Sequence, residues 1–295
     1  MILELERQKR NTAWMFLIPA LAVYLLFVAG PLLVSFYYSL VKWNGVGAKV
    51  FVGWRNFQKL LTSEQYGTAF WNTIKLTGVS LLVQIPTALV LAFLLYRSIH
   101  GTKVFRALIF LPVVISPIAI GFMFTIFYNS ELGPLNTLLD AVGLSALKRQ
   151  WLSDPDVLLY AVMAPQVWQF IGLHMVIHFA ALQTVPEEIF ESAHMDGASG
   201  TQVFFRLVVP LLWEVIQITI VLCVTGSLKS FGHPWIMTQG GPGVRSSYLT
   251  VLMFRVAFLE RNFGSASAIT ATVVILALTF TVVFRRLTSR DKIDY

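Results

Sequence analysis

The chain has 295 residues, of which 56% are hydrophobic and 13% charged, and its formal net charge is +7. A soluble domain of this size needs more charged side chains to cover its surface, so the composition favours a membrane protein. The mean hydropathy of +0.71 leaves no polar face for a nucleic acid, and a single cysteine, Cys223, excludes an internal disulfide.

The first predicted element is a long apolar run that follows the basic residues Arg7, Lys9 and Arg10. The run is too long for the apolar part of a signal peptide and has no small-residue cleavage site, so we expect it to stay as a membrane anchor. Lys42 is the next charged residue.

The remaining spans are located by the distances between charges. A spanning helix needs about 20 apolar residues, and a charge is costly at the bilayer centre. Glu214 is the only acid inside a predicted span, and it lies near one end, where it can reach the headgroups. The sequence therefore predicts an all-α membrane protein whose six transmembrane helices fall within residues 11–41, 76–96, 107–130, 157–186, 211–231 and 262–284.

Orientation follows from the distribution of lysine and arginine. With the N-terminus inside, the cytoplasmic pieces are roughly twice as dense in basic residues as the outer pieces. Both termini are therefore expected in the cytoplasm. The predicted parts are a cytoplasmic N-terminus (1–13), a six-helix transmembrane domain (14–286) and a cytoplasmic tail (287–295).

Pro112 and Pro117 interrupt the third predicted span, where tolerated kinks and hinges are both open interpretations. The outer segment 41–69 mixes glycine with aromatic residues, and Trp43 and Trp54 are expected at headgroup level.

The cytoplasmic loop between the fourth and fifth spans, residues 185–210, predicts two short helices. Pro186 suits a helix start, and acids in the first turn complement the helix dipole. Ile189, Phe190 and Ala193 form an apolar side. Gly197 then permits a turn of positive φ, and a second helix restarts near Thr201.

This loop has two possible contact partners. It could lie on lipid headgroups, or it could dock on another protein. An anionic leaflet repels acidic residues, and a lipid-facing helix is usually basic, so the acids favour a protein partner. They are Glu187, Glu188, Glu191 and Asp196.

The same loop resembles the EAA loop of binding-protein-dependent ABC importer permeases. Glu191, Ser192 and Ala193 stand at the Glu-Ala-Ala position, with Ser192 replacing an alanine, and Gly197 is the spaced glycine. Leu207 and Pro210 match the final apolar-x-x-Pro element. Further segments, starting at Trp14, Phe105, Thr238 and Phe263, are similar to the carbohydrate branch, of the maltose and glycerol-phosphate type, in its compact six-helix form.

The resemblance implies a type I importer permease fold in a bacterial or archaeal inner membrane. It implies two ATPase subunits, a second homologous permease that makes a heterodimer, and an extracytoplasmic solute-binding protein. The chain contains no G-x-x-x-x-G-K-[ST] motif, so it is expected to be no enzyme and to bind no cofactor, with ATP and Mg²⁺ held by the ATPases. The residues expected to couple to the ATPase are Glu187, Glu188, Glu191, Ser192, Ala193, Asp196, Gly197, Leu207 and Pro210.

A substrate pathway is predicted along the fourth and fifth spans, because polar groups at that depth face protein or water rather than lipid. Hydrogen bonding between helices is the open alternative. His174 and His178 lack an evident third ligand, so no metal site is expected. The pathway candidates are Trp168, Gln169, Phe170, Leu173, Cys223, Gly226, Ser227 and Ser230.

The main rival class is a secondary transporter driven by protons or sodium. Such coupling usually uses buried carboxylates, and Glu214 near a helix end is a poor candidate. A membrane enzyme is disfavoured because no nucleophile and base recur within the spans. Dependence of uptake on ATP separates the importer from the secondary transporter.

Overall fold

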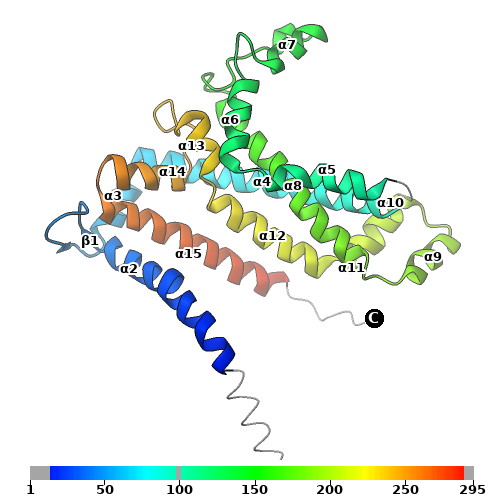
Figure 1. Cartoon of the computed structure of the whole chain (residues 1–295), viewed down its shortest axis with the longest axis horizontal. Coiled ribbons are helices and arrows are strands. Elements are labelled where there is room, and N and C mark those ends of the chain that lie inside the picture. Colours follow the sequence, from blue (N-terminus) through cyan, green and yellow to red (C-terminus); the bar gives the residue numbers. More distant parts are fainter. Residues whose placement is uncertain (1–13, 98–100, 289–295) are drawn as a thin grey trace, which may run out of the picture. The chain divides into compact units, whose positions relative to one another are not determined.

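The computed structural model describes residues 14–97 and 101–288, and nearly all of its regular structure is helical (Figure 1). The described chain divides into two compact units. The first contains residues 14–62 and 253–272, and the second contains residues 63–252 and 273–288.

The first unit begins with a helix over Trp14–Ser39 that includes the π-helical turn η1 (Leu25–Ala29) and α2 (Gly30–Ser39). Strands β1 (Val41–Lys42) and β2 (Val50–Phe51) then form an antiparallel hairpin in which Val41 lies opposite Phe51. Helix α3 (Arg55–Leu61) follows. The π-helical turn η4 (Arg255–Leu259) and the start of α15 (Phe263–Thr288) complete this unit.

The second unit is built around α4, which packs along α8 and α12. Small residues such as Ala88 and Ala92 allow these helices to approach closely, and Met175 and Leu182 of α8 fill the same core. The elements in chain order are α4 (Glu64–Arg97), α5 (Thr102–Val114), α6 (Pro117–Phe127), α7 (Pro134–Ala141), η2 (Ser145–Leu147), α8 (Leu158–Leu182), α9 (Glu187–Met195), α10 (Gly200–Val203), η3 (Phe204–Val208), α11 (Val209–Leu211), α12 (Trp213–Leu228), α13 (Gly232–Thr238) and α14 (Leu249–Phe254).

Among the described residues, four helices are long and apolar enough to cross a membrane, or up to five if the bent pair of α5 and α6 is one span. They are Trp14–Ser39, Glu64–Arg97, Trp213–Thr238 and Phe263–Thr288. The fourth predicted span is occupied by α8, a helix of 25 residues without charge. Its glutamines and histidines lower its mean hydropathy, so α8 is not among the four helices that are apolar enough to be counted as spans.

The third predicted span differs most from the expectation, because α5 and α6 meet at an angle of 96°. Pro117 opens α6, and the residue before a proline is driven to extended backbone, as Ser116 is at ψ 136°. The Ser116 hydroxyl then accepts a hydrogen bond from the Ile118 amide and caps the new helix. Figure 1 shows α6 turning away from α5 to lie beside α13, with which it packs. Pro117 therefore stands at a change of direction, whereas Pro112 lies inside α5.

The fifth predicted span also differs. Its helix α12 ends at Leu228, and α13 begins at Gly232 after a short break, within an overall span of Trp213–Thr238. Gly232 lies against Pro117, with its β-carbon position 3.0 Å from the Pro117 ring, so a larger residue would press on the bend between α5 and α6.

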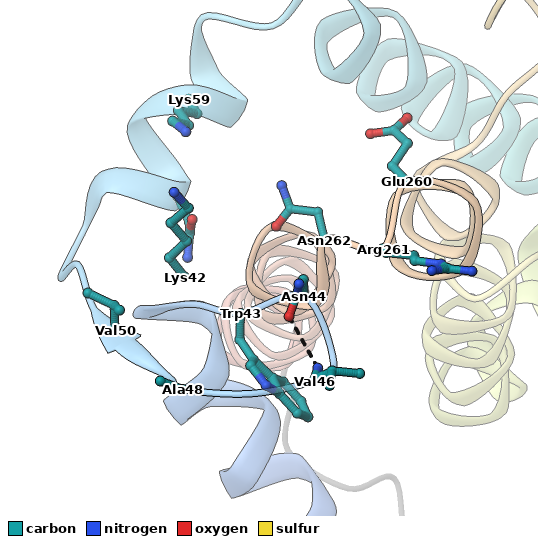
Figure 2. A pocket seen from close by; sticks show the side chains of 11 residues that line it. Lys42, Trp43, Asn44, Val46, Ala48, Val50, Lys59, Glu260, Arg261 and Asn262 are labelled. Atoms are coloured by element: carbon teal, nitrogen blue, oxygen red, sulfur yellow. Dashed lines mark hydrogen bonds between the residues drawn. The ribbon is translucent and has the colours of Figure 1, made fainter.

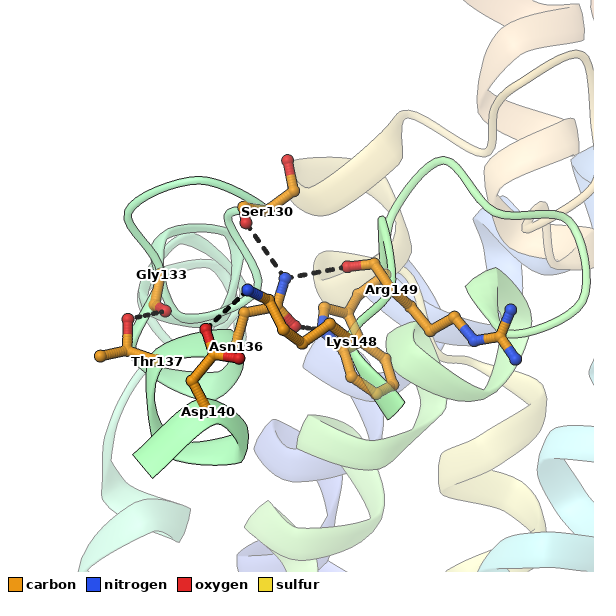
Figure 3. A network of polar contacts seen from close by, with 8 residues as sticks. Ser130, Gly133, Asn136, Thr137, Asp140, Lys148 and Arg149 are labelled. Atoms are coloured by element: carbon orange, nitrogen blue, oxygen red, sulfur yellow. Dashed lines mark hydrogen bonds and ion pairs between the residues drawn. The ribbon is translucent and has the colours of Figure 1, made fainter. Parts of the chain in front are cut away.

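A loop between α6 and α8 folds on itself around Asn136 of α7 (Figure 3). The Asn136 amide donates to the carbonyl oxygens of Ser130 and Arg149, both at 3.1 Å, and its oxygen accepts from the Trp151 indole at 2.9 Å. Lys148 lies 2.6 Å from Asp140, and this hydrogen bond holds the pKa of the Asp140 carboxyl below its ordinary value. Residues 130–151 therefore form a closed loop with its own polar centre.

Candidate functional site

The loop 185–210 contains two short helices, as predicted. Pro186 caps α9 with extended backbone, and Glu187 and Glu188 occupy the first turn. The apolar side is anchored by Phe190, which is buried and whose ring centroid lies 5.3 Å from that of Tyr96 in α4. Figure 1 shows α9 at the end of the second unit where α4 ends and α10 and α11 lead into α12. Helix α9 therefore packs against the end of α4, in the same core cluster as Leu212 at the start of α12.

Gly197 forms the turn between the two helices. Its φ is +71°, a conformation that residues with a β-carbon rarely adopt. The amide of Ala198 donates to the Ala193 carbonyl at 3.0 Å, and that of Gly197 donates to the His194 carbonyl at 3.0 Å, which closes a Schellman-type helix end. No atom lies within 4 Å of the β-carbon position, so it is the backbone angle and not space that requires glycine.

The second helix starts with a capping box that the sequence reasoning missed. The Ser199 amide donates to Gln202 Oε1 at 2.7 Å, and the Gln202 amide donates to the Ser199 hydroxyl. The pattern Ser-x-x-Gln was a signal that could have placed the start at Gly200 rather than near Thr201. From there a helix runs to Leu211, with Leu207 half-buried and Pro210 exposed.

The acidic side chains of this loop are free to meet a partner. Glu187, Glu188, Glu191 and Asp196 are exposed, and none of them forms an ion pair with another residue in the described part of the chain. Ser192 is also exposed, and Ala193 is half-buried. The loop presents an acidic surface on one side and packs against α4 on the other.

The pathway candidates separate into two groups. Gln169, Cys223, Ser227 and Ser230 are buried inside the second unit. Trp168 and Gly226 are exposed on its surface, and Phe170 and Leu173 are half-buried.

Gln169 is 1% exposed and holds the bend between α5 and α6. Its Nε2 donates to the carbonyl oxygens of Pro112 at 3.1 Å and Ile115 at 2.8 Å. A helix that breaks at Ser116 leaves nearby carbonyls without their helical partners, and such groups are costly inside a membrane. The amide of Gln169 supplies such a bond to Ile115 and adds a second one to Pro112, whose carbonyl also accepts from the Ile115 amide at 3.2 Å.

Other buried polar groups link α4, α8 and α12. The Ser230 hydroxyl donates to Gln166 Oε1, and the Cys223 thiol donates to Gln84 Oε1 at 3.3 Å. Gln84 Nε2 lies 3.5 Å from the Gln166 carbonyl. Sequence reasoning did not select Gln84, although a glutamine inside an apolar span was a signal for it.

The two histidines of α8 are buried, and one of them meets a hydroxyl of α12. His178 Nε2 lies 2.9 Å from the Thr219 hydroxyl of α12. The described residues contain no group of three or more potential metal ligands among histidine, cysteine, aspartate and glutamate.

Gly172 marks the closest approach of α8 to α5. A β-carbon on it would overlap the backbone carbonyl of Ile109 and lie 2.9 Å from the Phe110 Cα atom. The sequence reasoning did not select this glycine, because a lone glycine in a helix does not reveal which helix it meets.

Comparison with known proteins agrees with this architecture. Residues 84–290 match the family described as the binding-protein-dependent transport system inner membrane component. A probable ABC transporter permease protein, YurN of Bacillus subtilis, is 35% identical over 92% of this chain and 94% of its own length. The trehalose/maltose transport system permease protein MalF of Thermococcus litoralis is 27% identical over 95% of both chains. The chain therefore belongs to the family of inner-membrane components of binding-protein-dependent transport systems.

A solved structure shows the same fold. A chain of a bacterial ABC transporter involved in the import of the polysaccharide alginate superposes with a TM-score of 0.82, at 20% identity and over 98% of both chains. Membership of the family makes this chain a multi-pass inner-membrane subunit that is not itself catalytic, and it implies ATPase partners and a solute-binding protein.

Proposed function

We propose that this chain is a permease subunit of an ABC importer that carries a sugar or oligosaccharide into the cytoplasm. The observation that carries the proposal is similarity over almost the whole chain to permeases named for sugars. These include the Thermococcus litoralis trehalose/maltose permease and the lactose transport system permease protein LacF of Rhizobium radiobacter, which is 29% identical over 92% of both chains.

The proposed topology has six spans with both termini in the cytoplasm. In this arrangement α8 is the fourth span, and its buried glutamines and histidines are tolerated because they face protein rather than lipid. The pieces are a cytoplasmic N-terminus at 1–13, a transmembrane domain at 14–286 with the coupling loop at 185–210, and a cytoplasmic tail at 287–295. Residues 1–13 and 289–295 lie outside the described residues.

The proposed assembly contains a second, homologous permease, two ATPase subunits that hold ATP and Mg²⁺, and the binding protein. In it, α9 enters a groove of an ATPase subunit, where Glu191 meets a basic residue. The contact of Phe190 with Tyr96 and the continuous path from α10 to α12 support a role in transmitting motion. Closing of the ATPase pair would then move α4 and α12 as rigid bodies.

The pathway is proposed along the surface of the second unit, where Trp168 of α8 and Gly226 of α12 are exposed. The second permease would cover this surface, so each chain supplies half of the lining. The buried links among Gln84, Gln166 and Ser230 support the alternative for those residues, that they hold helices together. Gln169, Cys223 and Ser227 are buried in this structure, so solute would reach them only if the helices around them moved apart.

The proposal predicts uptake of labelled sugars by the purified assembly in proteoliposomes that contain ATP, when the binding protein is present outside. Uptake should persist with a proton ionophore and stop without ATP. Gly226→Trp should reduce this uptake at least tenfold by filling the pathway, since Gly226 is exposed and no atom lies within 4 Å of its β-carbon position.

Gly226→Ala is the matched control and should transport like the wild type, because a methyl group does not block a passage wide enough for a sugar. Uptake that follows an ion gradient and ignores ATP would contradict the importer and support the rival secondary transporter. Normal uptake by Gly226→Trp would remove this surface from the pathway.

A further inference from the structure

A cavity of about 440 Å³ lies in the first unit, whereas the predicted pathway residues belong to the second (Figure 2). Its walls come from the hairpin and α3, residues 42–59, and from residues 260–262 just before α15. Figure 2 shows Lys42 and Lys59 on one side and Asn262 and Glu260 on the other. A smaller neighbouring cavity is lined by the same two lysines, Lys42 and Lys59, and by Arg55. The two lysines therefore form a basic wall that both cavities share.

The cavity is a built feature, because its frame is tightly bonded. Asn56 is buried, and its Nδ2 donates to the carbonyl oxygens of Ser39 at 2.8 Å and Val41 at 2.9 Å. Gly264 in the first turn of α15 lies directly against the Val41 carbonyl, where a β-carbon would overlap it. Its amide donates to the Trp43 carbonyl at 3.3 Å. The hairpin and the start of α15 are thus held together.

The charge of the cavity is unbalanced. Lys42, Lys59 and Arg261 line it together with one acid, Glu260. Within residues 14–97 and 101–288, none of these three cations forms an ion pair or a side-chain hydrogen bond with an acid. Unpaired cations around a hollow create a positive potential that attracts an anion. The buried indole nitrogen of Trp43 also lacks a hydrogen-bond partner among the described residues.

The ends of two spans place the cavity at the depth of lipid headgroups. The helices Trp14–Ser39 and Phe263–Thr288 each have 26 residues, or about 39 Å at 1.5 Å per residue, whereas the hydrocarbon core is about 30 Å thick. In the sequence, the lining residues start just after the end of the first helix, and the last of them stand just before the start of the second. Both helix ends therefore bring it to the membrane surface.

The surroundings have the composition of a membrane interface. Lys49 Nζ lies over the rings of Tyr38 and Trp43, at 4.6 and 4.8 Å from their centroids. Phe51 and Trp54 are 67% and 69% exposed. Amphipathic aromatic residues and exposed apolar side chains of this kind gather at headgroup level. Together with the lysines, they favour lipid headgroups as the neighbours of the cavity.

We propose that this cavity binds the phosphate of an anionic phospholipid, with Lys42 and Lys59 as the main contacts. The proposed topology assigns the lipid to the outer leaflet, and the site itself is independent of which solute is carried. Binding would fasten the end of the first span to the start of the last. Outer segments are usually poor in basic residues, so this function also accounts for the basic cluster between Lys42 and Lys59.

The test is native mass spectrometry of the intact transporter released from nanodiscs that contain phosphatidylglycerol and phosphatidylcholine in equal amounts. The wild type should retain phosphatidylglycerol in preference to phosphatidylcholine. The double variant Lys42→Gln with Lys59→Gln should retain about 30-fold less of it, which corresponds to about 2 kcal/mol. Glu260→Gln should retain as much as the wild type or more, because it removes a like charge.

Lys148→Gln is the matched control, since it removes an exposed lysine of the loop around Asn136, in the second unit. It should leave lipid retention unchanged. Equal retention by the wild type and the double lysine variant would overturn the proposal. If the double variant retains the lipid normally but binds the solute-binding protein more weakly in phosphatidylcholine nanodiscs, the proposal is also overturned. The basic wall would then belong to a protein interface. Displacement of the lipid signal by millimolar inorganic phosphate would assign the site to the free ion. Retention is read without transport, so failure here leaves the proposed function standing.

Discussion

Glu191→Lys should abolish uptake while leaving the chain folded and inserted. Glu191 is exposed and forms no ion pair with another described residue, so its loss should change the stability of the chain itself by no more than about 0.5 kcal/mol. In the proposed assembly, a lysine at this position would face a basic residue of the ATPase groove and leave that residue without its acidic partner. The cost is on the order of 2 to 5 kcal/mol in the free energy of association. The measurement is sugar uptake together with the amount of ATPase that copurifies.

Glu131→Lys is a matched control, because Glu131 is an exposed acid on the loop after α6 and is predicted to lie on the outer side. It should keep both uptake and ATPase. If Glu191→Lys retains ATPase and solute-stimulated hydrolysis at the wild-type level, Glu191 has no part in coupling.

Gly172→Val should prevent assembly of a stable transporter. The added side chain meets the backbone of α5 at Ile109 and Phe110, and backbone cannot rotate aside as a flexible side chain does. Overpacking of this kind costs about 1 to 3 kcal/mol, and a clash with backbone belongs at or above the upper end. Thermal unfolding of the purified complex should show a clear loss of melting temperature, with reduced yield.

Gly78→Val tests whether the effect is specific. Gly78 lies in α4, and no atom lies within 4 Å of its β-carbon position, so the same substitution meets open space. Its melting temperature should stay close to that of the wild type. Equal losses in both variants would mean that helix propensity, and not the contact of α8 with α5, determines the result.

Much of the local structure could be predicted because its causes are local. Pro186 and Gly197 set the limits of α9 through their own backbone preferences, so the helix pair was found from sequence. The apolar runs located α15 and the end of α4 in the same way, but α4 begins at Glu64, inside the segment 41–69 that was predicted to lie outside the membrane as a loop.

The bend between α5 and α6 depends on contacts from distant parts of the chain. Ser116 and Pro117 signal an interruption, but its angle is fixed by the amide of Gln169 on α8 and by packing against α13. Whether Gln169 or Ser230 faces the pathway or another helix also depends on which helices are its neighbours, and a single sequence does not give that arrangement. Their roles therefore remain predictions.

The most direct test of coupling through α9 uses a photo-crosslinking amino acid at Met195, which is 89% exposed at the end of α9. In membranes that contain the whole assembly, irradiation should attach the chain to an ATPase subunit. The same label at Leu132, which is 87% exposed on the loop after α6, should give no ATPase adduct. Absence of an ATPase adduct from Met195, or equal adducts from both positions, would contradict docking of the ATPase on this helix.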